Sequence, residues 1–108
     1  RRLIVERFND LFTKYDGFIM PTIDAIAPKF GETSDKLSDQ YLVLGNHLLI
    51  SNFGGYPSIS IPSGFVNKMP IGVCITGAQQ NDALVLNIAH EIEETMTYRG
   101  MIVGEDNV

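Results

Sequence analysis

The chain has 108 residues, which suits one domain or part of a larger one, and 44% of them are hydrophobic, as in a globular protein rather than a disordered one. Eight Lys and Arg residues against 13 Asp and Glu residues give a net charge of −5, which argues against a broadly basic surface for direct binding of nucleic acid. The single cysteine excludes an internal disulfide and favours a reducing compartment, expected to be the cytoplasm, and no apolar run reaches the roughly 18 residues of a membrane span.

Residues 2–14 are predicted to form an amphipathic helix that ends at Asp16-Gly17. Its apolar side chains recur at helical spacing and share one face: Ile4, Phe8, Leu11, Phe12 and Tyr15. A helix already under way at Arg1, without an initiator methionine, favours a chain cut from a longer protein. A trimmed or incomplete start is the alternative.

The next segments alternate between extended and helical patterns. Residues 18–20, an apolar run closed by Pro21, are predicted to form a short buried strand. Residues 21–37 are expected to be a long loop, because prolines, a glycine and polar residues interrupt any periodicity. A second helix is expected over residues 38–53, although Gly45 disfavours it, and the Gly-Gly-Tyr-Pro sequence that follows ends it.

Two segments then show the alternation of β-strands. Serines and isoleucines alternate in residues 58–62, and in residues 71–76 the small Gly72, Cys74 and Thr76 face away from the apolar side chains. The small face predicts close packing of a bulky group. Residues 63–69 are expected to connect the two strands, and because seven residues are too few for a parallel crossover, the strands are expected to pair antiparallel.

The last predicted helix begins at Asn81 or Asp82, whose side-chain oxygens suit a helix cap, and is expected to end at Gly100. Residues 101–108 are expected to be a flexible tail. The predicted buried stripe of this helix consists of Val85, Ile88, Ala89, Ile92 and Met96.

Catalytic motifs are scarce. Glycine-rich phosphate loops and the G-x-S-x-G elbow are missing from the sequence, and one cysteine with two distant histidines gives weak support for zinc, so no metal ligand is predicted. Cys74 is expected to be an inert buried thiol and His90 a structural residue, whereas His47 either is structural or lines a pocket. Residues 52–62 favour tight helix–strand packing, with a pocket wall as the alternative.

Four segments, in order, resemble the amidase signature family. Residues 15–22 (YDGFIMPT) are similar to its aspartate, apolar and Pro-Thr segment, and Ala27-Pro28 with Gly31-Glu32 resemble the loop that follows. Residues 52–62 (NFGGYPSISIP) resemble N-L-A-G-x-P-x-(I/L)-S-(V/I)-P, and residues 70–75 (PIGVCI) resemble P-(I/V)-G-(L/V)-Q-(I/L). The likeness covers roughly residues 1–98, and within the family these segments look most like the C-terminal end of glutamyl-tRNA(Gln) amidotransferase A subunits.

The resemblance implies an α/β fold in which residues 1–108 are the C-terminal portion of an amidase-type domain. A short mixed sheet is expected, with antiparallel strands near 58–61 and 71–76 and two or three flanking helices. Because such a piece is cut from a larger sheet, it is expected to self-associate or to expose a large apolar patch.

The resemblance also implies which reactions the A subunit carries out and which its partner subunits carry out. Family enzymes use a Lys-Ser-Ser triad whose serine attacks a carboxamide, and the A subunits release ammonia from glutamine so that another subunit can amidate Glu-tRNA(Gln). The triad belongs to earlier parts of the family's chain, so no catalytic residue is expected here. The implied partners are the B and C subunits, with tRNA contacted mainly through a partner, and ATP and Mg used there rather than by this chain.

Two positions depart from the family pattern. Family A subunits carry an aspartate, able to bind the amino group of glutamine, where this chain has Gly45 followed by Asn46, and Cys74 replaces a frequent glutamine. The open alternatives are another amidase signature hydrolase and a free-standing small α/β binding module. The substrate-pocket candidates are Pro21, Thr22, Asn46, Asn52, Gly54 and Gly55.

Overall fold

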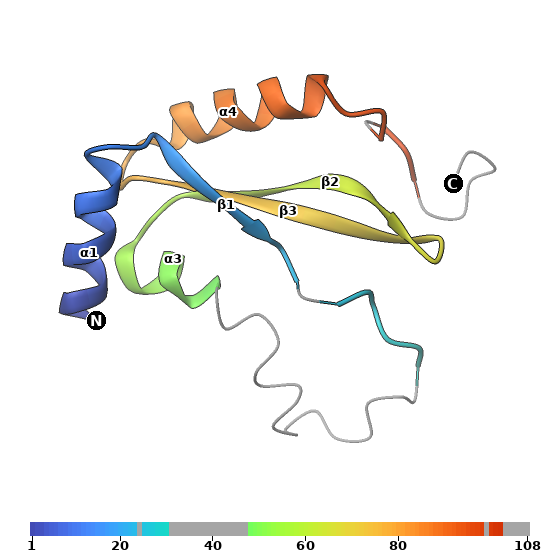
Figure 1. Cartoon of the computed structure of the whole chain (residues 1–108), viewed down its shortest axis with the longest axis horizontal. Helices are drawn as coiled ribbons and strands as arrows, with labels where there is room; N and C mark the ends of the chain where they lie inside the picture. Colours follow the sequence, from blue (N-terminus) through green and yellow to red (C-terminus); the bar gives the residue numbers. More distant parts are fainter. Residues whose placement is uncertain (24, 31–47, 99, 103–108) are drawn as a thin grey trace.

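A computed structural model describes residues 1–23, 25–30, 48–98 and 100–102. These residues form an α/β fold in which helices lie on both sides of a three-stranded sheet (Figure 1), as expected from the sequence. The elements, in chain order, are α1 (Arg2–Phe12), β1 (Gly17–Pro21), α3 (Leu49–Gly54), β2 (Ser58–Val66), β3 (Met69–Gly77) and α4 (Asp82–Glu94).

The strands lie in the order β1-β3-β2, so β3 is the central strand. Phe18 of β1 and Ser58 of β2 lie on either side of Thr76 of β3, and both ladders are antiparallel. The predicted antiparallel pairing of residues 58–61 with 71–76 is confirmed. The parallel pair that the expected mixed sheet would contain is not among the described strands, because consecutive β2 and β3 turn back on each other and β1 adds with the same antiparallel sense.

The link between β2 and β3 is a two-residue turn rather than the seven-residue connection predicted over 63–69. β2 continues through an irregularity in the ladder next to Gly64, whose φ of 146° suits glycine. Asn67 and Lys68 both have positive φ, 50° and 65°, as in the type I′ turns that join tightly paired strands. The register shift lies between Pro62 and Gly64. Beyond it the side chains no longer alternate as in residues 58–62, so the sequence pattern does not indicate that the strand continues.

α4 packs on β2 and β3 and forms the main apolar core with them. Ile61, Ile75 and Ala89 are buried together, and Val85 of α4 is 2% exposed. The predicted stripe is therefore confirmed. Half-buried side chains surround this core: Ile59, Val73, Ile88, Ile92 and Met96.

The ends of α4 differ in part from the prediction. The helix starts after Asn81 as expected, but the Asn81 side chain makes no capping hydrogen bond. It ends at Glu94 rather than at Gly100, because the backbone N–H and the hydroxyl of Thr95 both donate to the carbonyl of Ile92 and close the last turn.

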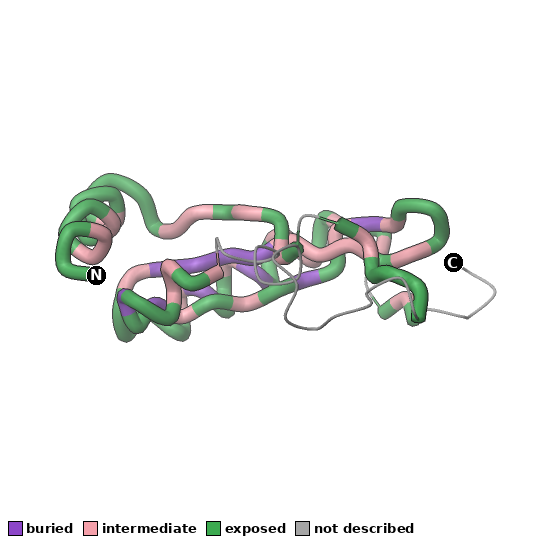
Figure 2. Tube along the Cα trace, turned by 90° about the horizontal axis from the view of Figure 1, so that it is seen from below, coloured by how far each residue is buried: buried purple, intermediate pink, exposed green. Residues whose placement is uncertain are grey.

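α1 and α3 lie at one end of the sheet, on the face opposite α4 (Figure 1). Phe8 and Phe12 of α1 pack on Phe18 of β1, with ring centroids 5.3 and 5.8 Å apart. The predicted apolar stripe is only partly used, since Leu11 and Tyr15 remain 45% and 62% exposed. Figure 2 shows α1 without a buried position along its length.

Several predicted features fall partly on residues that the structure does not describe. α3 corresponds to the C-terminal end of the helix predicted over 38–53, and residues 38–47 lie outside the described residues. The same holds for residues 31–37 of the predicted loop and for residues 103–108 of the predicted tail.

Candidate functional site

Small polar side chains line the β2 and β3 part of the sheet face opposite α4, beside Phe18 and Met20 of β1. We call this set the hydroxyl face. Directly paired residues of neighbouring strands point to the same side, so Ser58 shares a face with Thr76, and Ser60 shares it with Cys74. The hydroxyl face consists of five hydroxyl side chains and one thiol: Thr22, Ser51, Ser58, Ser60, Cys74 and Thr76.

At the α3 end of the hydroxyl face three hydroxyls form a connected cluster. Ser51 Oγ lies 2.7 Å from Ser58 Oγ, and Ser58 Oγ lies 2.7 Å from Thr76 Oγ1. Thr76 is 1% exposed, and its hydroxyl also lies 3.5 Å from Ser51 Oγ and 4.0 Å from Cys74 Sγ. α3 is therefore fixed to the sheet by hydroxyl contacts.

A second hydroxyl pair lies further along β3. The hydroxyls of Thr22 and Ser60 are hydrogen-bonded above Gly72, where an added Cβ would lie 2.9 Å from Ser60 Oγ and 3.0 Å from Thr22 Oγ1. The small residue leaves room for two hydroxyls, not for the bulky group that the sequence predicted. Ser60 is paired with Cys74 and Ser58 with Thr76, so the two hydroxyl groups are offset by two residues, about 7 Å along the strands.

The turn after α3 is tightly packed. The ring of Tyr56 covers Gly54 so closely that a Cβ there would overlap it, and Gly55 takes a left-handed conformation with φ of 67° that ends the helix. The Tyr56 hydroxyl lies within donor distance of the Val5 carbonyl (3.2 Å) and of Asn9 Oδ1 (3.0 Å). Burial disfavours the charged form and raises the pKa of Tyr56 above its ordinary value of 10.0.

The structure separates the residues predicted to line a substrate pocket. Thr22 belongs to the hydroxyl face, and Pro21 is exposed beside it at the end of β1. Gly54 and Gly55 form the turn after α3, at the other end of the sheet face, and Asn52 is exposed on α3. Asn46 lies outside the described residues.

The serines and the threonine that connect these positions are not among the site residues predicted from the sequence. Ser51, Ser58, Ser60 and Thr76 join Thr22 on one face, yet none was a predicted site residue. The signal was the alternation in residues 58–62 and 71–76, which already placed the small polar side chains of each strand on one side. What the sequence did not show was that the two polar sides coincide.

The hydroxyl face can bind polar groups but cannot by itself activate a nucleophile through the contacts it makes. Each hydroxyl can donate one hydrogen bond and accept others, as a carboxamide requires. Activation of a serine needs a neighbour that accepts its proton near neutral pH, and the hydroxyls of this face are held by other hydroxyls. The geometry therefore fits a binding wall or a structural layer.

Residues 1–23, 25–30, 48–98 and 100–102 offer neither a metal site nor a membrane span. In these ranges no three His, Cys, Asp or Glu side chains gather in a way that could hold a metal ion. Within the same ranges no helix combines the length and the apolar character needed to cross a bilayer.

Comparison with known proteins links this geometry to one family. A family model described as Amidase matches residues 1–86. The glutamyl-tRNA(Gln) amidotransferase A subunit of Thermotoga maritima is 36% identical over 98 residues, covering 91% of this chain and 20% of that protein. The counterparts from Bacillus pumilus and Saccharolobus solfataricus are 38% and 33% identical, covering 87% and 90% of this chain.

The fold agrees with that likeness. The crystal structure of the glutamyl-tRNA(Gln) amidotransferase A subunit from Thermotoga maritima superimposes with a TM-score of 0.83 at 35% identity. The match covers 90% of this chain and 21% of that one. The chain thus spans about a fifth of the length of the curated relatives it matches.

Proposed function

The chain belongs to the Amidase family, and on that basis we propose that it is the C-terminal region of a glutaminase subunit. In this proposal the whole protein releases ammonia from glutamine for transamidation of Glu-tRNA(Gln) to Gln-tRNA(Gln). The observation that carries the proposal is the likeness to glutamyl-tRNA(Gln) amidotransferase A subunits along about nine-tenths of this chain.

The proposed role of this region is to build a wall of the site, not to perform the chemistry. A serine of the Lys-Ser-Ser triad, outside this chain, attacks the carboxamide carbon, and ammonia leaves as the acyl-enzyme forms. The hydroxyl face supports this assignment, because it offers hydrogen bonds to a polar amide without a group that takes up a proton. We propose no catalytic residue within these 108 residues.

The proposal includes the setting of the whole enzyme. Its partners are the B and C subunits of the amidotransferase, and tRNA is contacted mainly through a partner. ATP and Mg are used by the complex through a partner subunit rather than by this chain. We propose that the complex works in the cytoplasm.

A transplant experiment tests the proposed function. This chain replaces the matching C-terminal fifth of the Thermotoga maritima A subunit, and the chimera is assayed with its B and C partners for glutamine hydrolysis and for amidation of Glu-tRNA(Gln). Retained hydrolysis of glutamine supports the proposal. A well-folded chimera that hydrolyses other amides but not glutamine would contradict it.

The isolated chain provides the complementary measurement. Purified alone, it should release no ammonia from glutamine, because the proposed triad lies elsewhere. If ammonia release is detected, the same assay on Ser51→Ala, Ser58→Ala and Ser60→Ala identifies its source. Turnover lost in one of these variants would place a nucleophile on the hydroxyl face and refute the proposed division of labour.

One observation favours a second candidate, another amidase signature hydrolase. Gly45 and Asn46 occupy the region where family A subunits carry an aspartate for the amino group of glutamine. A hydrogen bond to a charged group contributes about 1.5–3 kcal/mol, so restoring the carboxylate with Gly45→Asp should raise kcat/KM for glutamine about 10- to 150-fold in the chimera. An unchanged value would favour a substrate without that amino group, and Asp24→Asn is a control that changes a carboxylate elsewhere in the sequence.

A further inference from the structure

The two groups of hydroxyls on the hydroxyl face differ in the number of O–H groups they leave unused. Ser51, Ser58 and Thr76 make three mutual contacts, so each of the three O–H groups has an acceptor within the cluster. Thr22 and Ser60 share a single hydrogen bond, and within residues 1–23, 25–30, 48–98 and 100–102 neither hydroxyl bonds to another group. One of the two O–H groups of this pair is therefore left to donate outward.

The backbone holds both hydroxyls of the pair in fixed positions. Ser60 belongs to β2, and Thr22 continues the pairing of β1, since its N–H donates to the Gly72 carbonyl at 3.0 Å. Gly72 lies between them, and its missing side chain lets the two hydroxyls meet across β3. Ser60 is exposed and Thr22 is half-buried, so a ligand can reach the unused donor.

A primary carboxamide complements this pair of hydroxyls. Its oxygen and nitrogen lie about 2.3 Å apart, and one edge of the group presents an acceptor beside a donor. Hydrogen-bonded hydroxyl oxygens lie about 2.5–3.0 Å apart, and this pair presents one donor beside acceptor lone pairs. One hydroxyl can donate to the amide oxygen while the other accepts from the amide nitrogen. The hydrogen bonds then form a closed ring in which each bond polarises the next.

The surface beside the pair suits the methylene chain of such an amide. Met20, Cys74 and Ser60 are directly paired across the three strands, so their side chains lie in one row on this face. Met20 is half-buried, and its thioether is apolar and adaptable. Cys74 is 5% exposed and lies between the other two. The row thus offers apolar contact next to the hydroxyl pair.

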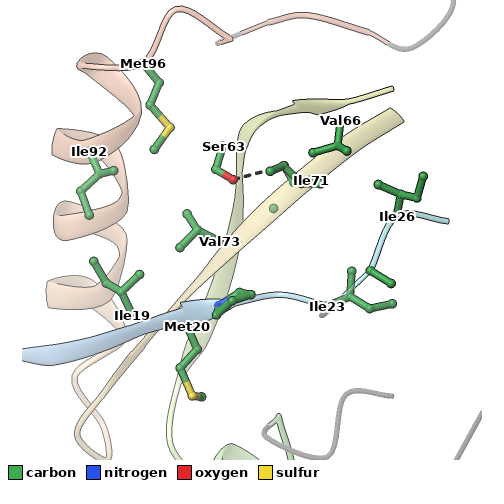
Figure 3. Close-up of a pocket in the computed structure, with 13 residues that line it drawn as sticks. Ile19, Met20, Ile23, Ile26, Ser63, Val66, Ile71, Val73, Ile92 and Met96 are labelled. Carbon is green, nitrogen blue, oxygen red and sulfur yellow. Dashed lines mark hydrogen bonds between the residues drawn. The ribbon is translucent and has the colours of Figure 1, made fainter. Parts of the chain in front are cut away.

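The other face of the same strands lacks this arrangement. A cavity of about 730 Å³ lies there beside α4, lined by apolar side chains that include Ile19, Val73 and Ile92 (Figure 3). Ser63 supplies the one hydroxyl among its described lining side chains, and this hydroxyl donates to the Ile71 carbonyl at 3.5 Å. A single hydroxyl cannot close a ring of hydrogen bonds with both polar atoms of an amide.

We propose that Thr22 and Ser60 are specificity-determining residues that together bind the carboxamide group of the substrate. The inference rests on the proposed function, since the substrate is the amide that the whole protein hydrolyses. The pair holds the amide before reaction, and attack on its carbon belongs to the triad outside this chain. The ligand class is a primary carboxamide on a methylene chain. An ester of the same acid lacks the N–H group and leaves the ring open.

The preference of the chimera for amide over ester tests the pair. The Thermotoga maritima A subunit that carries this chain is assayed with its B and C partners on glutamine and on glutamate γ-methyl ester, which yields the same acyl group. Thr22→Val and Ser60→Ala should each raise KM for glutamine about tenfold and leave kcat and the KM for the ester within about twofold. The double variant should lose about as much as either single variant, because the ring needs both hydroxyls.

Three further variants separate recognition from structure. Thr22→Ser keeps the hydroxyl and should keep the amide preference. Gly72→Ala keeps both hydroxyls but places a Cβ 2.9 Å from Ser60 Oγ and 3.0 Å from Thr22 Oγ1, so it should separate them and raise KM for glutamine as the single variants do. Ser63→Ala removes a hydroxyl of β2 on the opposite face and should change neither substrate. Circular dichroism shows whether each variant is folded.

Three outcomes would overturn the proposal. The first is an equal loss on amide and ester in Thr22→Val and Ser60→Ala, which would give the pair a structural role. The second is a loss of amide preference in Ser63→Ala as large as in Ser60→Ala. The third is a chimera that hydrolyses the ester and no primary amide.

The identity of the amide separates this inference from the proposed function. A chimera that hydrolyses another primary amide but not glutamine counts against the function alone, and the variants are then measured on that amide and its methyl ester. A selective loss on that amide still supports the pair. Glutamine hydrolysis that Thr22→Val and Ser60→Ala leave unchanged counts against the pair alone.

Discussion

Ile75 and Thr76 are adjacent on β3 and equally buried, at 1% exposure, yet they belong to two chemically different faces of one sheet. Ile75 packs with Ile61 and Ala89 in an apolar core under α4. Thr76 lies in a cluster of hydroxyls with Ser51 and Ser58. Burial by itself therefore does not say how a position contributes to stability.

The two faces should contribute very different free energies. Removing apolar surface from water stabilises the fold in proportion to its area, whereas a hydroxyl hydrogen bond replaces one that water makes in the unfolded chain. The apolar face is thus expected to hold the domain together. The hydroxyl face is expected to contribute less to the free energy of folding, so its residues can serve in binding at a smaller cost in stability.

The largest expected effect comes from the apolar face. Ile75→Ala should lower the free energy of unfolding by about 2–5 kcal/mol, because it leaves a cavity among Ile61 and Ala89. Urea denaturation measures this change. Ile75→Val is the control and should cost about 0.5–1.5 kcal/mol. If Ile75→Ala lowered the free energy of unfolding by less than about 1 kcal/mol, Ile75 would not be part of the core that stabilises the domain.

The next effect tests the packing of the Tyr56 ring on Gly54 in the turn after α3. Gly54→Ala should destabilise the fold by about 1–3 kcal/mol, because the new methyl group overlaps the ring of Tyr56. Near-ultraviolet circular dichroism would report the displaced ring and urea denaturation the energy. Gly55→Asn is a control with open space around it and a left-handed backbone that asparagine tolerates, and it should cost clearly less. Equal costs would mean that backbone conformation, not packing, sets the sensitivity of this turn.

A smaller effect, with a distinct pH dependence, is expected at Tyr56. Tyr56→Phe removes a hydroxyl that bonds to α1 and should cost about 0.5–1.5 kcal/mol at pH 7. Burial raises the folded pKa of Tyr56 above 10.0, so the unfolded chain loses this proton first, and the stability of the unmodified chain falls as the pH rises through 10.

The Phe variant lacks this loss. The difference in unfolding free energy between the two chains should therefore narrow from pH 9 to pH 11 in parallel urea titrations. A difference that stays constant or widens would show that the folded hydroxyl ionises as readily as the unfolded one.

The smallest effect belongs to the hydroxyl face. Thr76→Val keeps the shape and removes the hydroxyl, and it should cost about 1 kcal/mol or less, because Ser51 and Ser58 remain bonded to each other at 2.7 Å. Thr76→Ser, which keeps the hydroxyl, is compared in the same denaturation series. If Thr76→Val lowered the free energy of unfolding by more than about 2 kcal/mol, the hydroxyl face would contribute about as much to stability as the apolar face.

The sequence predicted the parts of the fold that follow from local periodicity. The stripe of α4 and the alternation in residues 71–76 were enough to place Val85, Ala89 and Ile75 in the core. The second half of β2 was not predicted, because the irregular register beside Gly64 interrupts the alternation and the turn uses Asn67 and Lys68 rather than Asn-Gly.

The candidate site was less predictable, because it depends on contacts between distant segments. Thr22 was selected through the family resemblance, but its partner Ser60 was not, since 38 positions separate them. Gly54 was selected as a pocket residue, whereas the structure gives it a packing role under Tyr56. The local sequence pattern predicts on which face of its strand a side chain lies. Which residues of other segments it contacts is seen only in the folded sheet.

The two-residue turn at Asn67 and Lys68 also has a consequence for the order of folding. β2 and β3 are neighbours in sequence, so their hairpin closes a very short loop, on a timescale of about 1–10 μs for isolated hairpins. Pairing of β1 with β3 closes a loop that contains residues 22–68, and this costs more chain entropy than closing the two-residue turn between β2 and β3. β1 is therefore expected to join the sheet last and to detach first, so its amides should exchange with solvent deuterium before those of β3 that face β2.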